Sequence, residues 1–281
     1  MLKYRGGKFA DIKYFKEHFP RNFDTFLEPF VGGGAVYFYL EHKKSIINDI
    51  NEKLITFYLQ LQNNYQEVRR QLDELQGIYD INQSAYEALK KKAGKNERVE
   101  NKNENLYYEL RDKFNNPDNK WLEAVLYFFI NKTAYSGMIR YNKNGFYNVP
   151  YGRYKNFNTK IITEKHHELL KRTYIYKTDF AEIFKMANED DFIFLDPPYH
   201  KAIFNDYGNP EHENGFSEAE HLRLADEYKK LKCKALMVIS KTELTEKLYG
   251  DYVVGEYGKS YAVNIRNRFK NVAEHIIVKN Y

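Results

Sequence analysis

The stretch Phe26-Leu27-Glu28-Pro29-Phe30-Val31-Gly32-Gly33-Gly34 decides how this 281-residue chain folds. A short apolar segment, 24–28, predicts a strand that ends in a glycine-rich turn, and residues 35–40 predict a helix directly after it. Residues 45–49, which contain the apolar pair Ile46-Ile47, predict the next strand. Strand, helix and strand in this order form a βαβ unit, which favours a parallel sheet.

The same alternation returns late in the chain. Predicted strands and helices are 173–177 (strand), 180–186 (helix), 191–196 (strand), 217–231 (helix), 235–240 (strand) and 272–278 (strand). Ser217 and Glu220 form the pattern of a capping box at the start of the second helix. The chain is therefore predicted to be an α/β protein with one sheet, interrupted by a helical insertion at 56–159 that separates residues 1–55 from 160–281.

The insertion itself contains two unusual segments. Residues 90–105 are rich in Lys, Asn and Glu, which predicts a solvated loop between helices, with further helices at 106–114 and 121–130. Residues 133–158 are polar and aromatic, contain glycine and show no clear period. Loops of this length usually carry a function or are disordered.

Composition excludes several classes of protein. No apolar run approaches the roughly 18 residues of a membrane span, and the N-terminus lacks the apolar core of a signal peptide, so a cytoplasmic protein is expected. The single cysteine, Cys233, rules out an intramolecular disulfide framework, and the histidines show no ligand spacing, so no metal site is expected.

The net charge of +5 is compatible with a polyanionic partner. The 17% aromatic content suits stacking on bases, although a low-GC codon bias explains it equally well.

The glycine turn and the following strand indicate a cofactor site. Glycines allow the backbone to approach a ligand closely, and Asp49 ends the second predicted strand, where an acidic residue can hold a ribose diol. We therefore expect an adenosine-type cofactor, against the alternative of a purely structural turn.

Asp196-Pro197-Pro198-Tyr199 follows a buried strand and indicates the chemistry. The Asp196 carboxylate and the Pro197 carbonyl can each accept a hydrogen bond from an exocyclic amino group, and Tyr199 offers a flat face to a heterocycle. Because the lone pair of such an amine is delocalised into the ring, two acceptors favour its relocalisation as a methyl group arrives, and the carboxylate stabilises the developing positive charge.

These motifs occur in the order found in Dam-like DNA adenine-N6 methyltransferases, which the chain resembles over nearly its whole length. The resemblance rests on residues 3–8, 28–34, 48–51, 135–154 and 196–199. It implies a Rossmann-like methyltransferase sheet, S-adenosylmethionine as cofactor, duplex DNA with a flipped adenine as substrate, and GATC as target.

The resemblance also implies site residues. Asp196, Pro197 and Tyr199 correspond to the catalytic clamp, and the positions matching the family's cofactor site are Tyr4, Lys8, Phe30, Gly32, Gly34, Asp49, Asp179, Phe180 and Asp196. Tyr4 replaces a more usual tryptophan.

Residues 135–154 resemble the family's target-recognition loop. Arg140 matches an arginine that reads guanine, Met138 and Pro150 match apolar contacts near thymine, and Tyr135 matches a residue that stacks beside the flipped base. Lys132 and Arg153 fall at phosphate contacts, and Lys3 at a flanking base. Ser136 replaces a common asparagine. The residue types in this segment agree with a role in DNA recognition. The amide of Asn142 can donate and accept hydrogen bonds, the aromatic side chains can fill the space that a flipped base leaves, and the basic side chains can contact phosphates.

The sequence thus predicts that 1–55 and 160–281 bind the cofactor and the flipped adenine, and that 56–159 recognises DNA. We expect a monomer, with a cognate restriction endonuclease as a partner acting on the same site. Two alternatives stay open: the same chemistry on cytosine N4, RNA adenine or a protein glutamine amide, and a DNA-binding relative that has lost catalysis.

Overall fold

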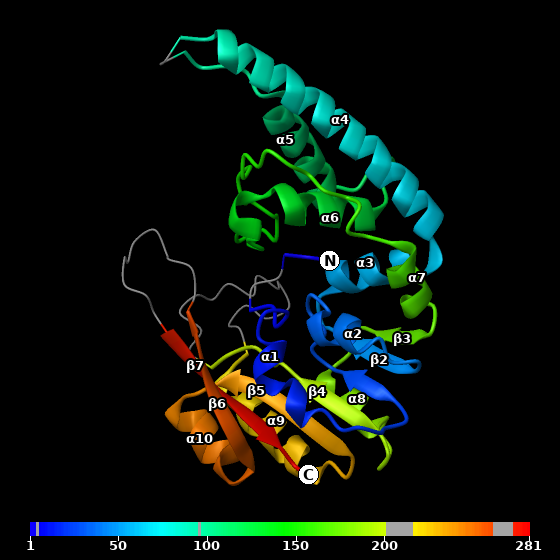
Figure 1. Cartoon of the computed structure of the whole chain (residues 1–281), viewed down its shortest axis with the longest axis vertical. Coiled ribbons are helices and arrows are strands. Elements are labelled where there is room, and N and C mark those ends of the chain that lie inside the picture. The colour runs from blue at the N-terminus through cyan, green and yellow to red at the C-terminus, as the bar shows by residue number, and fades with distance from the viewer. Residues whose placement is uncertain (4–5, 95–96, 201–215, 261–271) are drawn as a thin grey trace. The chain divides into compact units, whose positions relative to one another are not determined.

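The computed structural model describes residues 1–3, 6–94, 97–200, 216–260 and 272–281 (Figure 1). These residues divide into two compact units. The helical unit contains the described residues of 1–7 and 51–172, and the sheet unit contains those of 8–50 and 173–281 other than 208–210. No helix in the described part of the chain is long and apolar enough to cross a bilayer.

The sheet unit contains one mixed sheet, in which the described strands lie in the order β3-β2-β1-β4-β5-β7-β6. The strands are β1 (Phe26–Glu28), β2 (Ser45–Asn48), β3 (Thr173–Tyr176), β4 (Phe192–Leu195), β5 (Lys234–Ser240), β6 (Val253–Ser260) and β7 (Val272–Lys279). The first five of these strands in chain order pair in parallel, whereas β7 is antiparallel to both β5 and β6. This topology confirms the Rossmann-like α/β sheet that the sequence predicts.

The helices of the sheet unit connect these strands. They are α1 (Ile12–Phe15), η1 (Lys16–His18), α2 (Ala35–Leu40), α8 (Phe180–Lys185), α9 (Glu218–Lys230), α10 (Glu243–Tyr249) and η3 (Gly250–Tyr252). Ser217 caps α9, because its Oγ accepts the N–H of Glu220 at 3.2 Å. A capping box also needs the Glu220 side chain to accept the N–H of Ser217, and this part of the prediction is wrong. In the described part of the chain, the Glu220 carboxylate accepts a hydrogen bond from Arg223 at 2.6 Å instead.

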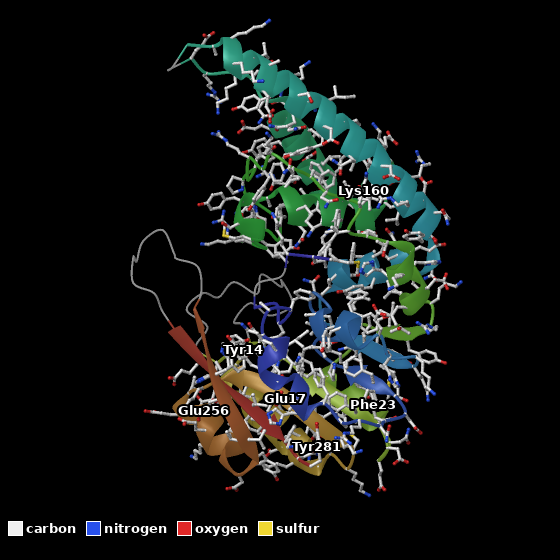
Figure 2. All side chains as sticks on the ribbon, viewed as in Figure 1. Tyr14, Glu17, Phe23, Lys160, Glu256 and Tyr281 are labelled. Atoms are coloured by element: carbon white, nitrogen blue, oxygen red, sulfur yellow. The ribbon has the colours of Figure 1, made fainter. Side chains whose placement is uncertain are left out.

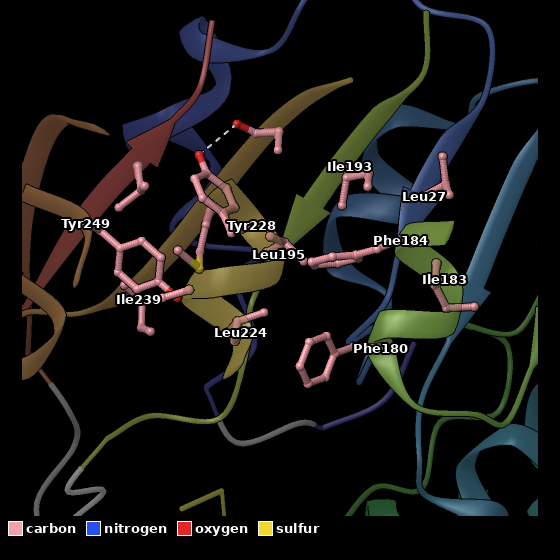
Figure 3. Close-up of a cluster of buried hydrophobic side chains, with 14 of the residues drawn as sticks. Leu27, Phe180, Ile183, Phe184, Ile193, Leu195, Leu224, Tyr228, Ile239 and Tyr249 are labelled. Atoms are coloured by element: carbon pink, nitrogen blue, oxygen red, sulfur yellow. Dashed lines mark hydrogen bonds between the residues drawn. The ribbon is translucent and has the colours of Figure 1, made fainter. Parts of the chain in front are cut away.

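The core of the sheet unit explains why the central strands are apolar throughout. All four residues of β4 are buried, as expected for a parallel strand covered on both faces. Figure 3 shows side chains of the strands packed against those of α8 and α9, with Leu195 near Phe184 and Leu224. Cys233 lies in this cluster, and burial raises the pKa of its thiol to about 11, so it is a packing residue and no nucleophile.

The helical unit consists of packed helices and the long segment that follows them. Its described helices are α3 (Glu52–Asn63), α4 (Tyr65–Lys92), α5 (Lys102–Asn115), α6 (Glu123–Thr133), η2 (Tyr135–Gly137) and α7 (Glu164–Leu170). In Figure 1, α4 is the long cyan helix.

The predicted loop at 90–105 is partly wrong, because helices enter it from both sides. α4 continues to Lys92, and α5 begins at Lys102, where the side chain of Asn101 accepts the N–H of Asn103 at 3.0 Å. Lys and Glu are good helix formers, and α5 buries Asn103, Tyr107, Leu110 and Phe114, so the packing of residues further along the helix stabilises its polar first turn.

Strand β6 was not predicted from the sequence. Its residues include Gly255 and Gly258, which weaken a strand pattern, and the pairing with β7 shifts register between Val253 and Gly255. The strand is stabilised by pairing along the length of β7, and a contact with a strand later in the chain cannot be read from the local sequence pattern.

Candidate active site

The two chemical motifs of the sequence follow neighbouring strands at the centre of the sheet. β1 pairs with β2 on one side and β4 on the other, and all three run parallel. The chain leaves β1 towards β2 and leaves β4 towards β5, so the strand order reverses between β1 and β4. Open α/β sheets bind ligands at the carboxyl ends of strands at such a reversal.

The turn after β1 has the backbone that its glycines allow. Gly32 and Gly34 have φ values of 46° and 69°, a region in which residues with a Cβ are strained. The Gly32 N–H donates to Oδ2 of Asp49 at 3.0 Å, which holds the Asp49 carboxylate against the turn. The structure therefore brings together Gly32, Gly34 and Asp49, which the sequence assigned to one cofactor site.

Asn48 is a positioning residue that the sequence analysis missed. Its Nδ2 donates to the carbonyl oxygens of Pro29 and Thr178 at 2.9 and 3.0 Å, and its Oδ1 accepts the N–H of Thr178 at 2.9 Å. The buried amide thereby joins the turns that follow β1 and β3. Only its position beside Asp49 at the end of a strand could have indicated this role.

The turn after β4 is held by a lysine from the start of the chain. Nζ of Lys8 lies 2.6 Å from Oδ1 of Asp196 and also donates to the hydroxyl of Tyr199. The Lys8 side chain is 2% exposed, against 22% for Asp196. Lys8 therefore contacts both side chains of the predicted clamp, and the cofactor contact that the resemblance implies for it stays a prediction.

A second carboxyl group lies buried behind this pair. Glu28 is the last residue of β1, and its Oε2 accepts the N–H of Tyr37 in α2 at 3.0 Å. Burial raises the pKa of Glu28 well above its usual range, and the charges of Asp196 and Asp49 raise it further. The fold therefore favours the protonated form of Glu28 relative to a carboxyl group in water.

Aromatic rings gather beside the glycine turn. The ring centroid of Phe30 lies 5.4 Å from that of Phe180 and 6.0 Å from that of Phe216. Phe180 begins α8, and the guanidinium of Arg223 lies 4.2 Å from the centre of its ring. Phe216 and Arg223 were not identified from the sequence, because nothing local in the sequence connects α9 with this turn.

Asp179 caps α8 and forms an ion pair with Arg223. Its Oδ1 accepts the N–H of Ala181 at 2.9 Å, and its two oxygens accept from Arg223 at 2.8 and 2.7 Å. Arg223 lowers the pKa of Asp179, and the helix N–H adds to this effect. Asp179 is therefore a carboxylate fixed in orientation next to the aromatic rings.

In the helical unit, residues 140–148 form a hairpin. The N–H of Asn142 donates to the carbonyl oxygen of Phe146 at 2.8 Å, and Tyr141 forms a bridge with Tyr147. Oδ1 of Asn142 accepts the N–H groups of Asn144 and Phe146, each at 2.9 Å, so this predicted DNA-binding side chain builds the turn.

Buried and half-buried polar side chains anchor this hairpin. Asn115 of α5 exchanges two hydrogen bonds with the backbone of Tyr147, at 2.8 and 3.0 Å. The hydroxyl of Tyr107 donates to the carbonyl of Val149 at 2.8 Å, and that of Tyr147 donates to the carbonyl of Met138 at 2.8 Å. Much of the aromatic content in this region is thus packing, while the hairpin residues Arg140 and Phe146 are exposed.

The predicted guanine-reading side chain stands on this hairpin. Nε of Arg140 donates to Oδ1 of Asn148 at 2.8 Å, across the hairpin. Its pair of Nη groups is then directed by Asn148, to which the sequence analysis assigned no role.

The other predicted DNA contacts lie next to the hairpin. Tyr135 and Pro150 are both exposed and joined by a backbone hydrogen bond of 2.9 Å. Ser136 has a φ of 55°, in the left-handed region that asparagine tolerates better than most residues. Arg153 is 72% exposed and lies 3.6 Å from Glu104.

Lys3 and Lys132 form a cationic cluster in the same unit. The side chain of Asn131 holds the backbone of Lys3 by two hydrogen bonds of 2.8 and 2.7 Å. Nζ of Lys3 donates to the carbonyl of Lys132 at 2.9 Å and lies 3.5 Å from the ring centre of Tyr154. Burial, together with the charge of Lys3, lowers the pKa of Lys132 to about 8.

Tyr4, a predicted cofactor contact, lies outside the described residues.

Comparison with known proteins identifies the family. Residues 4–264 match the model of the D12 class N6 adenine-specific DNA methyltransferases. The chain belongs to this family. The resemblance to Dam-like enzymes is thereby confirmed, and the protein is a site-specific DNA adenine methyltransferase.

Two curated relatives of the D12-class enzyme match it over nearly their whole length, and a third matches over most of it. It is 34% identical to type II methyltransferase M.CviBI of Paramecium bursaria Chlorella virus NC1A, covering 100% of this chain and 99% of the relative. It is 33% identical to type II methyltransferase M.MjaIII of Methanocaldococcus jannaschii, covering 100% and 98%. The DNA adenine methylase of Escherichia coli K12 is 28% identical over 80% of this chain and 73% of its own.

Proposed function

We propose that this D12-class enzyme transfers the methyl group of S-adenosylmethionine to N6 of an adenine flipped out of duplex DNA, within the sequence GATC. One observation carries the proposal: Asp196 and Tyr199, which follow the central strand β4, are both held by the buried Lys8. GATC follows from the Dam-like resemblance of residues 135–154.

The residues of the sheet unit fit the cofactor. The positive φ values of Gly32 and Gly34 leave room for a ligand to approach the backbone, and Asp49 at the end of β2 can accept from ribose hydroxyls. Phe30 and Phe180 offer apolar faces beside Asp179. When bound, S-adenosylmethionine supplies an electrophilic methyl carbon on a sulfonium.

The clamp makes the adenine amine reactive. Asp196 accepts one N6 hydrogen and the Pro197 carbonyl accepts the other, which favours the lone pair localised on nitrogen. Tyr199 stacks on the base, and Lys8 fixes both side chains before the substrate arrives. The Asp196 carboxylate stabilises the positive charge that forms on N6. The target base must leave the helix because N6 is paired inside the duplex.

The helical unit supplies the contacts to DNA. We propose that Arg140 reads guanine, that Tyr135, Met138, Asn142 and Pro150 contact bases near the target, and that Lys3, Lys132 and Arg153 contact the backbone or a flanking base. In this proposal residues 56–159 recognise the site, and 1–55 with 160–281 hold the cofactor and the flipped adenine.

Two further parts of the proposal concern assembly. The names of M.CviBI and M.MjaIII as type II methyltransferases support a cognate endonuclease acting on the same site. We propose that the enzyme acts on DNA as a monomer in the cytoplasm.

The deciding experiment incubates the enzyme with unmethylated plasmid DNA and S-adenosylmethionine and maps every modified adenine by sequencing. Modification of the adenine of GATC supports the proposal, and modification elsewhere refutes the target. Asp196→Ala and Asp196→Asn should abolish transfer while circular dichroism shows an intact fold. Binding measured from about 50 to 200 mM salt should weaken steeply, because phosphate contacts release counterions.

A further inference from the structure

A stack of aromatic rings reaches from the surface of the sheet unit to Tyr199. The ring of Tyr199 meets the edge of His275, with centroids 5.2 Å apart and planes at 68°. His275 stacks on Tyr257 at 5.0 Å and 12°, and Tyr257 stacks on Tyr14 at 4.8 Å and 14°. Tyr14 is labelled on α1 in Figure 2.

The strands determine this geometry. Tyr257 of β6 and His275 of β7 are directly paired in the antiparallel ladder, so their side chains lie on the same face of the sheet. His275 is fully buried, and Tyr257 is nearly so. A flat ring at 275 is clamped between Tyr257 and Tyr199, where a branched aliphatic side chain would lose both contacts.

Helix α1 connects this stack to the other restraint on Tyr199. The N–H groups of Asp11 and Ile12 donate to the carbonyl of Lys8 at 2.7 and 2.9 Å, immediately before the helix that carries Tyr14. Lys8 holds the Tyr199 hydroxyl, and His275 meets the ring. The hydroxyl and the plane of Tyr199 are thus fixed from two directions within one unit.

We propose that His275 is a positioning residue that sets the plane of the Tyr199 ring for stacking on the flipped adenine. This inference rests on the proposed function, because it needs Tyr199 to contact the base. Burying a histidine in a strand costs desolvation free energy that burying a leucine does not. Filling the core therefore does not by itself explain a histidine at position 275, whereas the need for a flat ring between Tyr257 and Tyr199 does.

The test compares His275→Leu with His275→Phe, which keeps a flat ring. Single-turnover methylation of plasmid DNA should slow about tenfold for His275→Leu, because small misplacements of catalytic groups reduce rates strongly. His275→Phe should recover to within about twofold of the original rate. Binding of S-adenosylmethionine should be the same in all three proteins.

Ile277→Ala is the matched control. Ile277 is buried two residues further along β7, on the same side of the sheet, and pairs with Gly255 of β6. It should lower the melting temperature and leave the rate unchanged. An equal rate for His275→Leu and His275→Phe, or an equal loss in Ile277→Ala, overturns the inference.

A base-stacking signal separates positioning from stability. In a duplex with 2-aminopurine in place of the mapped target adenine, stacking on Tyr199 quenches fluorescence, so His275→Leu should be brighter than His275→Phe.

Tyr199→Ala separates the two levels of the proposal. If Tyr199→Ala keeps the original rate, the proposed role of Tyr199 fails. If Tyr199→Ala is slow but His275→Leu is not, only the inference about His275 fails. The double variant should be no slower than Tyr199→Ala, because His275 acts through that ring.

Discussion

The ammonium of Lys8 and the carboxylate of Asp196 form an ion pair of 2.6 Å in which the lysine side chain is almost completely buried. The two residues are 188 positions apart in the chain. Taking Lys8 out of water is costly, and the cost is offset by Asp196 and the Tyr199 hydroxyl. In the proposed mechanism this pair fixes the clamp before the substrate arrives, which is the form of preorganisation that favours catalysis.

Lys8→Met should lower kcat far more than it weakens cofactor binding. Without the ammonium, Asp196 loses its fixed orientation, and we expect a fall of about 10²–10³ in single-turnover rate. Calorimetric titration with S-adenosylmethionine and the single-turnover assay distinguish this from a cofactor contact, which would change the Kd first. Lys16→Met, at an exposed lysine of η1, is the control. A weaker Kd with an unchanged rate would contradict the clamp role.

Glu28→Gln should flatten the dependence of stability on pH. The pKa of Glu28 is raised in the folded protein, so from about 4.5 up to that raised pKa the folded state holds a proton that the unfolded state has lost. Stability therefore falls by up to about 1.4 kcal/mol per pH unit across this window. Glutamine stays neutral and can still accept from Tyr37, so the fall should disappear.

Urea unfolding at a series of pH values from about 5 to about 8 measures this effect. Glu52→Gln serves as the control, because it changes an acidic residue at the exposed start of α3. Equal slopes for the original protein and Glu28→Gln would show that Glu28 is ionised when folded.

Local patterns predicted the sheet well and the contacts between distant residues poorly. The βαβ unit around Gly32 and the strand before Asp196 were predicted because strands, glycine turns and helices have short-range signatures. The contact of Lys8 with Asp196 and that of Arg223 with Asp179 depend on which elements meet in space. Strand β6 was missed for the same reason, since β7 defines it.

Lys132 should make DNA binding weaken as the pH rises through the pKa of its ammonium group. Its pKa of about 8 in the free protein rises when a phosphate pairs with the ammonium, so binding takes up a proton. Affinity should be constant at low pH and fall above pH 8, by up to about tenfold per pH unit. Fluorescence anisotropy with a labelled duplex, at fixed ionic strength, measures the change from about pH 7 to about pH 9.

Lys132→Arg tests that assignment. Arginine keeps its charge over the whole range, so the pH dependence contributed by this position should vanish. Lys143→Arg, at an exposed hairpin position, should behave like the original protein. If Lys132→Arg retains the full pH dependence, another group, such as Lys3, whose pKa is also lowered by burial, is responsible.

Arg140→Ala should relax the choice of one guanine without abolishing methylation. A bidentate contact with guanine O6 and N7 discriminates by about 1–3 kcal/mol, and Nε of Arg140 is already occupied by Asn148, which leaves the two Nη groups for the base. Asn148→Ala should produce a smaller loss at the same base, because the arginine remains but is no longer oriented. Competition between duplexes that differ at single positions measures both effects. Arg153→Ala is the control, since a phosphate contact should weaken all duplexes alike. Unchanged discrimination in Arg140→Ala would remove this hairpin from base reading.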